Sequence, residues 1–177
     1  MNSSAEDGII PDFQDVYKHV FPIIYRVVLR IVHSEDVAEE LVQEAFIRYY
    51  EHRHKLADVN QAKYWLIRVS KNLALNHQKR KGREYRAYER AFHEPKREQR
   101  TAETSYLRGE SAKTVQEVLD QLPEKLRTVM ILKEYGGLSY KEIGDTMGIR
   151  EGNVKVRVFR ARERIAKLME EDDVYIP

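Results

Sequence analysis

LSYKEIGDTMGIREGNVKVRVFRARERI, residues 138–165, is the stretch of the 177-residue sequence that decides its fold. Ser139 and Glu142 have the spacing of a capping box, which predicts a short helix over residues 140–147. A turn containing glycine follows, and a long helix is predicted over residues 151–169. A short capped helix, a glycine turn and a second, basic helix form the layout of a DNA-binding helix-turn-helix.

The long helix of this motif has two faces when its residues are placed at intervals of about 100°. One face is apolar and is expected to pack inward; it holds Val154, Val158, Ala161, Ile165 and Leu168. The other is mostly cationic and holds Asn153, Val156, Arg157, Arg160 and Arg164. Arginine pairs with guanine and asparagine with adenine in the major groove, so this face suits base reading. Lys155 and Arg162 lie off this ridge and are expected to meet phosphates. The alternative is a cationic surface that faces only water.

Helices are also predicted for the rest of the chain, because 34% of its residues are charged, prolines number only 5, and strand-favouring runs are scarce. One is expected over residues 12–32, kinked or split at Pro22. A second should reach residue 53 after an N-cap at Ser34, and a third should run from residue 60 to a stop at Gly82. Two more are expected between residues 111 and 135. The expected fold class is all-α, with two small helical domains joined by a flexible linker.

The linker is predicted at residues 83–110, where apolar periodicity fades and Arg, Glu, Lys and Gln accumulate. The first domain is then expected at 12–82 and the second at 111–170. The remaining segments are expected to be a disordered tail at 1–11 and an acidic tail at 171–177.

Charge is separated along the chain, although the net charge is only +2. Residues 1–60 hold 6 Lys and Arg against 11 Asp and Glu, whereas residues 61–110 hold 13 against 6. Together with the basic final helix, the basic middle segment predicts two nucleic-acid contacts. The absence of Cys excludes disulfides and thiolate metal sites and fits a cytosolic location. No leader or membrane span is expected, because the most apolar stretch, 21–32, is short and interrupted by arginines.

The predicted second helix also has two faces. Its apolar stripe is expected in the core and holds Ala38, Leu41, Val42, Ala45, Phe46 and Tyr49. The opposite side is acidic around one apolar residue and holds Asp36, Glu40, Gln43, Glu44, Ile47 and Glu51. This composition suits a protein partner. Taken alone, it more often describes a solvated acidic face with one exposed isoleucine.

The predicted third helix carries a polar row spaced four residues apart that leads into a basic run. The row holds Arg68, Asn72 and Asn76, followed by Lys79 and Arg80. Asparagine lowers helix propensity but its amide bonds to base edges, which favours DNA reading. The alternative is a pair of surface asparagines near a frayed helix end. Trp65 is expected in the core, because it precedes Leu66 and Val69 on an apolar side.

Four blocks of sequence resemble the extracytoplasmic-function sigma factors, in that family's order. DVAEELVQEAFIRYYEH (36–52) resembles region 2.2, and AKYWLIRVSKNLALNHQKRKGR (62–83) is similar to regions 2.3 and 2.4. LDQLPEKLRTVMILKEYGGLS (119–139) and residues 139–165 resemble region 4. The resemblance implies a region 2 bundle and a region 4 helix-turn-helix, in a factor that gives RNA polymerase its promoter specificity.

The resemblance also implies partners and site residues. The acidic face would grip the β′ clamp helices of core RNA polymerase through Asp36, Glu40, Gln43, Glu44 and Ile47, of which Glu40, Gln43 and Glu44 match the family motif. The minus-10 element would be read and melted, by capture of a flipped base, at Arg68, Lys71, Asn72, Asn76, Lys79 and Arg80. The minus-35 element would be bound by Asn153, Lys155, Val156, Arg157, Phe159, Arg160 and Arg164. The polymerase β flap and an anti-sigma protein would be further partners, in the cytoplasm and on the nucleoid, without a cofactor.

Two features depart from the family pattern. The recognition helix commonly reads Gly-Thr-Val-Lys-Ser-Arg, whereas residues 152–157 read Gly-Asn-Val-Lys-Val-Arg. Gly144 stands where alanine is common, and glycine weakens a helix. The first departure bears on which minus-35 sequence is read.

Other classes of function are less well supported. Glu51 and His54 form a Glu-x-x-His spacing, but a di-iron bundle needs a second copy and none is present. The sequence has neither a Walker-type phosphate loop nor a Gly-x-Ser-x-Gly elbow, so no catalysis is expected. The strongest alternative is a helix-turn-helix regulator whose N-terminal domain senses a signal or dimerises. A pure protein-interaction module is the third class.

Overall fold

The computed structural model describes residues 11–92 and 110–172, and their side chains except those of 110–114 and 170–172. Seven α-helices and one short 3-10 helix make up this part of the chain, which contains no strand. The prediction of an all-α protein is therefore confirmed. Nearly all of the two expected tails and residues 93–109 of the expected linker lie outside the described residues.

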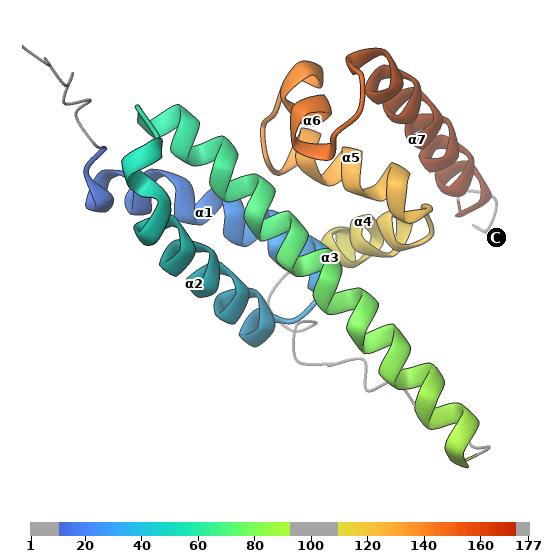
Figure 1. The fold of residues 1–177 in the computed structure, drawn as a ribbon. Helices are drawn as coiled ribbons and strands as arrows, with labels where there is room; N and C mark the ends of the chain where they lie inside the picture. Colours follow the sequence, from blue (N-terminus) through green and yellow to red (C-terminus); the bar gives the residue numbers. More distant parts are fainter. Residues whose placement is uncertain (1–10, 93–109, 173–177) are drawn as a thin grey trace, which may run out of the picture.

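The N-terminal half forms a bundle of α1 (Phe13–Val32), α2 (Glu35–His52) and α3 (Val59–Phe92), with the short η1 (Arg53–Lys55) between α2 and α3 (Figure 1). The predicted split at Pro22 does not occur, since α1 runs through it as one helix. A proline removes one main-chain hydrogen bond from a helix. Buried residues on both sides of Pro22 hold α1 in place: Val16, Val20, Ile24, Val27, Val28 and Ile31.

Helix α2 matches its prediction closely. The hydroxyl of Ser34 accepts a hydrogen bond from the Val37 main-chain N–H at 3.5 Å, which is the expected N-cap. All six residues of the predicted apolar stripe are buried. The acidic side of α2 is therefore fixed to face outward from the bundle.

Helix α3 is longer than predicted, because Gly82 does not end it and the helix continues to Phe92. A glycine ends a helix when it adopts a positive φ, and Gly82 does not. A glycine inside a helix costs only about 1 kcal/mol. The residues after it are good helix formers, and Arg80 pairs with Glu84 at 3.8 Å across one turn. The expected linker therefore begins as a helix over residues 83–92, and the far half of α3 projects beyond the bundle (Figure 1).

The C-terminal half consists of α4 (Glu110–Asp120), α5 (Glu124–Glu134), α6 (Tyr140–Met147) and α7 (Glu151–Asp172). The predicted capping box is present: Ser139 N–H donates to Glu142 Oε2 at 2.7 Å, and Glu142 N–H donates to Ser139 Oγ at 3.3 Å. Gly148 ends α6 with φ +67°. The inward face of α7 is also as predicted, with Val154, Val158 and Ala161 buried and Ile165 and Leu168 half-buried. The first two residues of the expected acidic tail, 171 and 172, belong to α7.

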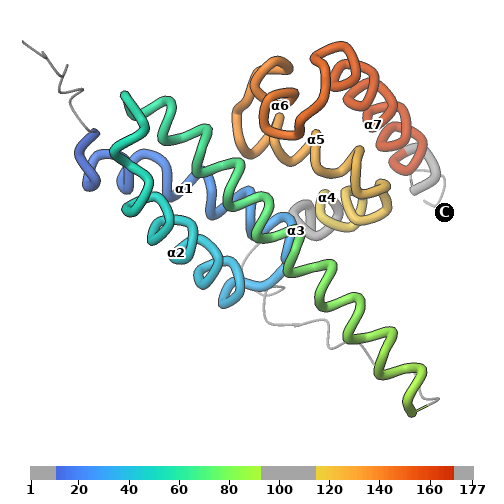
Figure 2. Tube along the Cα trace, in the orientation of Figure 1, coloured from blue at the N-terminus to red at the C-terminus, as the bar shows by residue number. Residues whose placement is uncertain are grey.

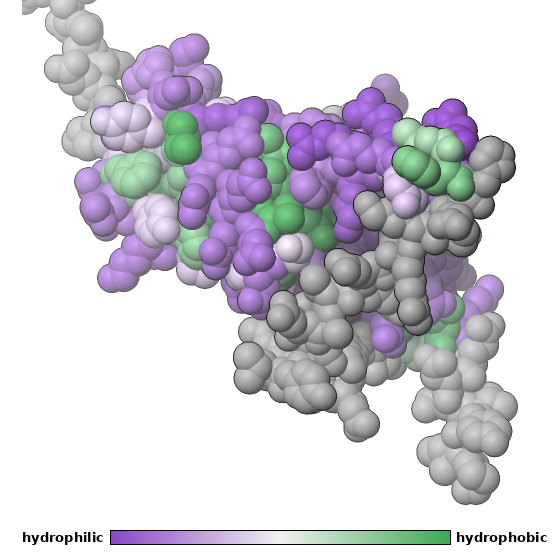
Figure 3. All heavy atoms as spheres, turned by 90° about the horizontal axis from the view of Figure 1, so that it is seen from below, coloured by the Kyte–Doolittle hydropathy of each residue, from purple (hydrophilic) through white to green (hydrophobic). Residues whose placement is uncertain are grey.

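The two halves pack against each other, chiefly through α1 with α5 and α3 with α6 (Figure 2). This arrangement sets α6 beside the N-terminal half of α3 and leaves α7 on the far side of the molecule. The surface is mostly hydrophilic on the face shown in Figure 3, with some hydrophobic residues at the end where α1 begins.

Candidate polymerase and nucleic-acid interfaces

The acidic face of α2 lies where the sequence placed it. Asp36, Glu40, Gln43 and Glu51 are exposed, Glu44 is half-buried, and Ile47 is 63% exposed. Glu44 forms an ion pair with Arg48 at 2.5 Å on the same helix. The face therefore offers carboxylates and an amide around a protruding isoleucine, opposite a fully buried stripe.

Aromatic residues missed by the sequence analysis extend this face. Tyr50 is 55% exposed, with the guanidinium of Arg53 stacked 3.8 Å from its ring centre. A shallow groove beside Ile47 is lined by Phe13, Phe46, Ile47, Tyr50 and Glu51. Tyr50 follows the buried Tyr49 directly, so helical spacing alone could have shown that it points outward.

The polar row of α3 is largely as predicted. Arg68, Asn72 and Asn76 are exposed, and so are Lys79 and Arg80. The row lies opposite the buried residues of α3, which include Leu66, Ile67, Ser70 and Ala74. It is therefore free to meet a ligand along its whole length.

Lys71 differs from the rest of the expected minus-10 group. It is only 6% exposed, and its Nζ donates a hydrogen bond to the main-chain oxygen of Thr146 in α6 at 2.9 Å. Burial, and secondly the charge of Arg68, lower the pKa of Lys71 below the usual lysine value. In this arrangement the C-terminal half covers Lys71, whereas its neighbour Asn72 in the polar row stays exposed.

Other contacts between the two halves were not foreseen. The hydroxyl of Tyr64 donates to the carboxylate of Glu142, which raises the pKa of Tyr64 and lowers that of Glu142. At the other end of the interface, Arg30 Nη1 donates to Gln116 Oε1 at 2.8 Å. The same Arg30 lies over the ring of Tyr135, 4.7 Å from its centre. No sequence pattern pairs residues so far apart, so only the packing of the halves shows these contacts.

An ion pair also joins the halves near the end of α1. His33 Nε2 lies 3.2 Å from Asp120 Oδ1. Burial by itself would raise the pKa of Asp120, but the hydrogen bond and charge of His33, with help from Gln116 and Arg127, lower it overall. The ionised carboxylate is therefore the form that this contact favours.

The outward face of α7 is accessible. Asn153, Lys155, Val156, Arg160 and Arg164 are exposed, Phe159 is 64% exposed, and Arg157 is half-buried. Two of the off-ridge cations are paired within the C-terminal half: Lys155 with Glu151 at 2.9 Å and Arg162 with Glu134 at 3.8 Å. The predicted base-reading ridge is thus the unpaired side of the helix within the described residues.

Gly144 positions this helix, which explains its departure from the family pattern. A Cβ on Gly144 would lie 2.7 Å from the main-chain oxygen of Ile149, closer than real Cβ contacts. The turn after α6 therefore packs directly on the α6 backbone, and only glycine leaves room for it. This close approach fixes where α7 starts.

Trp65 is half-buried, as expected of a residue packed on the core, and it stacks on His52 at 4.9 Å between ring centres. Among the described residues, no group of three His, Asp or Glu side chains could hold a metal ion. No helix in that part of the chain is long and apolar enough to cross a membrane.

Comparison with known proteins agrees with this arrangement. The model of the sigma-70 region 2 family matches residues 16–84, and that of the sigma-70 region 4 family matches residues 112–165. RNA polymerase sigma-H factor of Pseudomonas aeruginosa is 35% identical over 155 residues, covering 83% of this chain and 80% of its own length. The chain belongs to the extracytoplasmic-function sigma factors. Members of this family bind core RNA polymerase and direct initiation at specific promoters, and so does this sigma factor.

Two more relatives show how far the likeness extends. SigW of Bacillus subtilis is 30% identical over 172 residues, covering 92% of this sigma factor and 90% of its own length. The sigma-E factor of Escherichia coli K12 is 36% identical over 146 residues, covering 78% of this sigma factor and 76% of its own length. The alternative of a sensing or dimerising helix-turn-helix regulator is not favoured, because the likeness includes the N-terminal half.

Two solved structures share the fold. The sigma factor RpoE of Bartonella quintana, solved with the anti-sigma factor NepR, has a TM-score of 0.71 at 23% identity and covers 90% of this chain and 97% of its own. CnrH, solved with the cytosolic domain of CnrY, has a TM-score of 0.67 at 19% identity and covers 90% of this chain and 88% of its own. At this identity the likeness supports the architecture of the two halves.

Proposed function

We propose that this sigma factor uses three separate faces for its three contacts in initiation. The face of α2 that holds Asp36, Glu40, Gln43, Glu44 and Ile47 binds the β′ clamp helices. The row of α3 that holds Arg68, Asn72, Asn76, Lys79 and Arg80 binds the minus-10 element. The face of α7 that holds Asn153, Lys155, Val156, Arg157, Phe159, Arg160 and Arg164 binds the minus-35 element, and the same domain meets the β flap.

One observation carries this proposal: each face is exposed on a helix whose opposite side is buried in the core. A buried stripe fixes the rotation of its helix, so the outward side chains are held without help from a partner. The division into a first domain at 12–82 and a second at 111–170 is supported by the family matches, which end and begin close to those positions.

Strand separation then follows from binding, without an enzymatic step by the sigma factor itself. A flipped base held by α3 cannot return to the duplex. Binding of the single strand therefore shifts the equilibrium from paired to separated strands. Lys71 joins the minus-10 face only when α6 moves away from α3, because Thr146 now holds its ammonium group. Since polymerase and promoter DNA are in the cytoplasm, that is where the factor is proposed to act, on the nucleoid when bound to core polymerase.

An anti-sigma protein is a further proposed partner. One of the two solved structures with the same fold was determined with the anti-sigma factor NepR, and the other with the cytosolic domain of CnrY. A regulator that covers the faces of α2 and α7 would block polymerase and promoter at once. Competition between such a protein and core polymerase for this chain is the direct measurement.

Run-off transcription with purified core polymerase tests the function as a whole, and a chain that directs no initiation would refute it. The α2 face is tested by Glu40→Ala with Gln43→Ala, which should weaken association with core polymerase. Glu39→Ala is the matched control, because Glu39 is also an exposed carboxylate of α2 but is not among the residues assigned to this face. Equal association of all variants would remove the assignment of this face.

A further inference from the structure

Val156 points almost directly outward from the C-terminal half. The fully buried residues of α7, which are Val154, Val158 and Ala161, define the inward side of this helix. At about 100° per residue, Val156 lies within about 20° of the opposite direction. Its side chain is 47% exposed. An apolar side chain therefore occupies the centre of the face proposed to enter the major groove.

The neighbours of Val156 on this face are polar on one side and apolar on the other. Asn153 and Arg160 lie about 40–60° away on one side, and both are exposed. Phe159 lies about 60° away on the other side and is 64% exposed. One exposed apolar residue is ordinary on a protein surface. Two neighbouring ones, at the centre of a face proposed to bind DNA, gain most from contact with an apolar group of the DNA.

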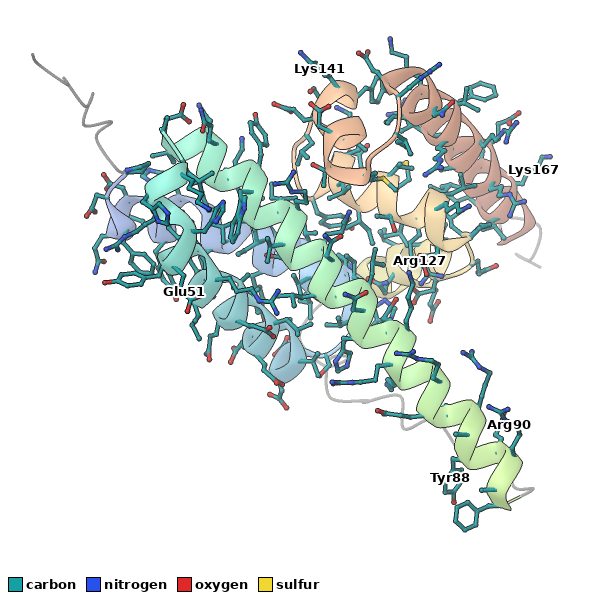
Figure 4. The ribbon with its side chains drawn as sticks, viewed as in Figure 1. Glu51, Tyr88, Arg90, Arg127, Lys141 and Lys167 are labelled. Carbon is teal, nitrogen blue, oxygen red and sulfur yellow. The ribbon has the colours of Figure 1, made fainter. Side chains whose placement is uncertain are left out.

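The start of α7 is open on the side of Val156. Gly152 lies one turn before Val156 on this side, and a Cβ built on it would have no atom of the described residues within 4 Å. Helix α7 lies at the outer edge of the molecule, with Lys167 near its far end (Figure 4). A valine side chain is short, so it touches a base edge only if the helix comes close to the groove floor. The missing side chain of Gly152 leaves room for that approach.

Charge limits this apolar contact to the first turns of α7. Glu163 is exposed and follows Val156 by seven residues, which places it on the same line along the helix. Its carboxylate is repelled by DNA phosphates. In a helix-turn-helix, the N-terminal residues of the second helix contact the base edges. Val156 and Phe159 lie in that part of α7, and Glu163 lies beyond it.

The major groove offers one apolar group that fits this surface. The bases present hydrogen-bond donors and acceptors there, and thymine adds its 5-methyl group. Asparagine pairs with N6 and N7 of adenine, the partner of thymine. Side chains three apart on a helix have Cβ atoms about 5–6 Å apart. Asn153 and Val156 can therefore contact the same A·T pair or two neighbouring pairs.

We propose that Val156 contacts the 5-methyl group of a thymine in the minus-35 element and thereby selects thymine at that position. This inference rests on the proposed function, because it takes α7 to bind the minus-35 element. It adds the base, and the group on that base, that this helix reads. The family pattern commonly has serine here, which offers a hydroxyl in place of two methyl groups. The contact is therefore a consequence of this chain's own valine.

The test uses the full chain bound to core polymerase and duplex promoter fragments that this complex selects from a library with a random minus-35 element. Each thymine of the selected element is replaced in turn by deoxyuridine, which keeps base pairing and removes only the methyl group. At one thymine at least, the dissociation constant should rise about fourfold, as expected for one buried methyl group.

Val156→Ser removes the protein side of the contact. Binding to the thymine fragment should weaken by a similar factor, and deoxyuridine at the sensitive position should then cost nothing further, which completes a double-mutant cycle. Val115→Ser is the matched control, because Val115 is also 47% exposed but belongs to α4. This control should keep the full sensitivity to deoxyuridine.

Three outcomes overturn the proposal. They are a selected element without thymine, tolerance of deoxyuridine at every position, and undiminished sensitivity in Val156→Ser. Failure of the proposed function is a separate result, because the unaltered complex would then bind equally well to a fragment with a scrambled minus-35 element, and the inference would fall with it. If scrambling weakens binding while every deoxyuridine is tolerated, the assignment of α7 stands and the Val156 contact alone is refuted.

Discussion

The two long helices proposed to meet DNA, α3 and α7, differ in how much of their outward face contacts the rest of the molecule. The outward ridge of α7 is free along its length, and its inward face rests on its own half. Helix α3 has a free row too, but one flank of that row is docked against α6 through Lys71 and Tyr64. In this arrangement the proposed minus-35 face is accessible, whereas the proposed minus-10 face includes Lys71 only after the halves part.

The largest expected effect tests the free helix. Arg157→Ala with Arg160→Ala should lower promoter-specific initiation at least about 30-fold, because each base-reading arginine is worth about 1–3 kcal/mol. Run-off transcription from a promoter with an intact minus-35 element is the measurement. The loss should be smaller on a promoter whose minus-35 element is scrambled, since the contact is then already missing.

Arg162→Ala is the control for this ridge. Arg162 lies on the same helix two residues from Arg160, but it points away and pairs with Glu134. It should change initiation less than either ridge arginine. If Arg162→Ala costs as much as Arg160→Ala, the loss reflects net charge, and the ridge has no special role.

The faces of α2 and α7 were predictable from the sequence because each depends on neighbours within the same helix. Helical spacing separated the buried stripe of Ala38, Leu41 and Val42 from the acidic side, and the Ser139 capping box located α6 to the residue. The same reasoning could not foresee that Lys71 is buried. Its exposure depends on Thr146, which is 75 residues away and is brought near only by the packing of the halves.

The end of α3 was mispredicted for a related reason. Glycine can end a helix, but whether it does depends on the φ that its surroundings favour, and a glycine leaves that choice open. Gly148 takes the positive φ and ends α6, whereas Gly82 stays helical between strong helix formers. Gly144 has a third role: it lacks a Cβ where the main-chain oxygen of Ile149 packs against the helix backbone.

A moderate effect should come from loosening the docked flank of α3. Tyr64→Phe removes the hydroxyl that donates to Glu142, a hydrogen bond to a charged but partly solvated group, worth on the order of 1 kcal/mol. The population of the parted state should rise several-fold. Because the chain has no native Cys, two dyes on introduced cysteines at Glu51 and Lys167 can report the distance between the halves by energy transfer.

Tyr140→Phe controls for loss of a hydroxyl, since no hydrogen bond of the Tyr140 hydroxyl is found in the described part of the chain and its ring contact with Lys133 is kept. Transfer should fall in Tyr64→Phe and stay constant in Tyr140→Phe. Constant transfer in both would mean that this bond does not hold the halves together, and the contrast between α3 and α7 would then rest on Lys71 alone.

The smallest expected effect concerns the free half of α3. Gly82→Ala should stabilise the helix locally by up to about 1 kcal/mol, because among the described residues a Cβ there would meet only Arg86 Nη1, at an ordinary 3.6 Å. Hydrogen exchange should slow by up to about fivefold at amides near residues 79–92 and stay unchanged in α1 and α2. The melting temperature should not move, since no residue from 79 to 92 is among the hydrophobic residues that form the core or pack on it. A fall in melting temperature would show instead that this half of α3 packs on the rest of the molecule.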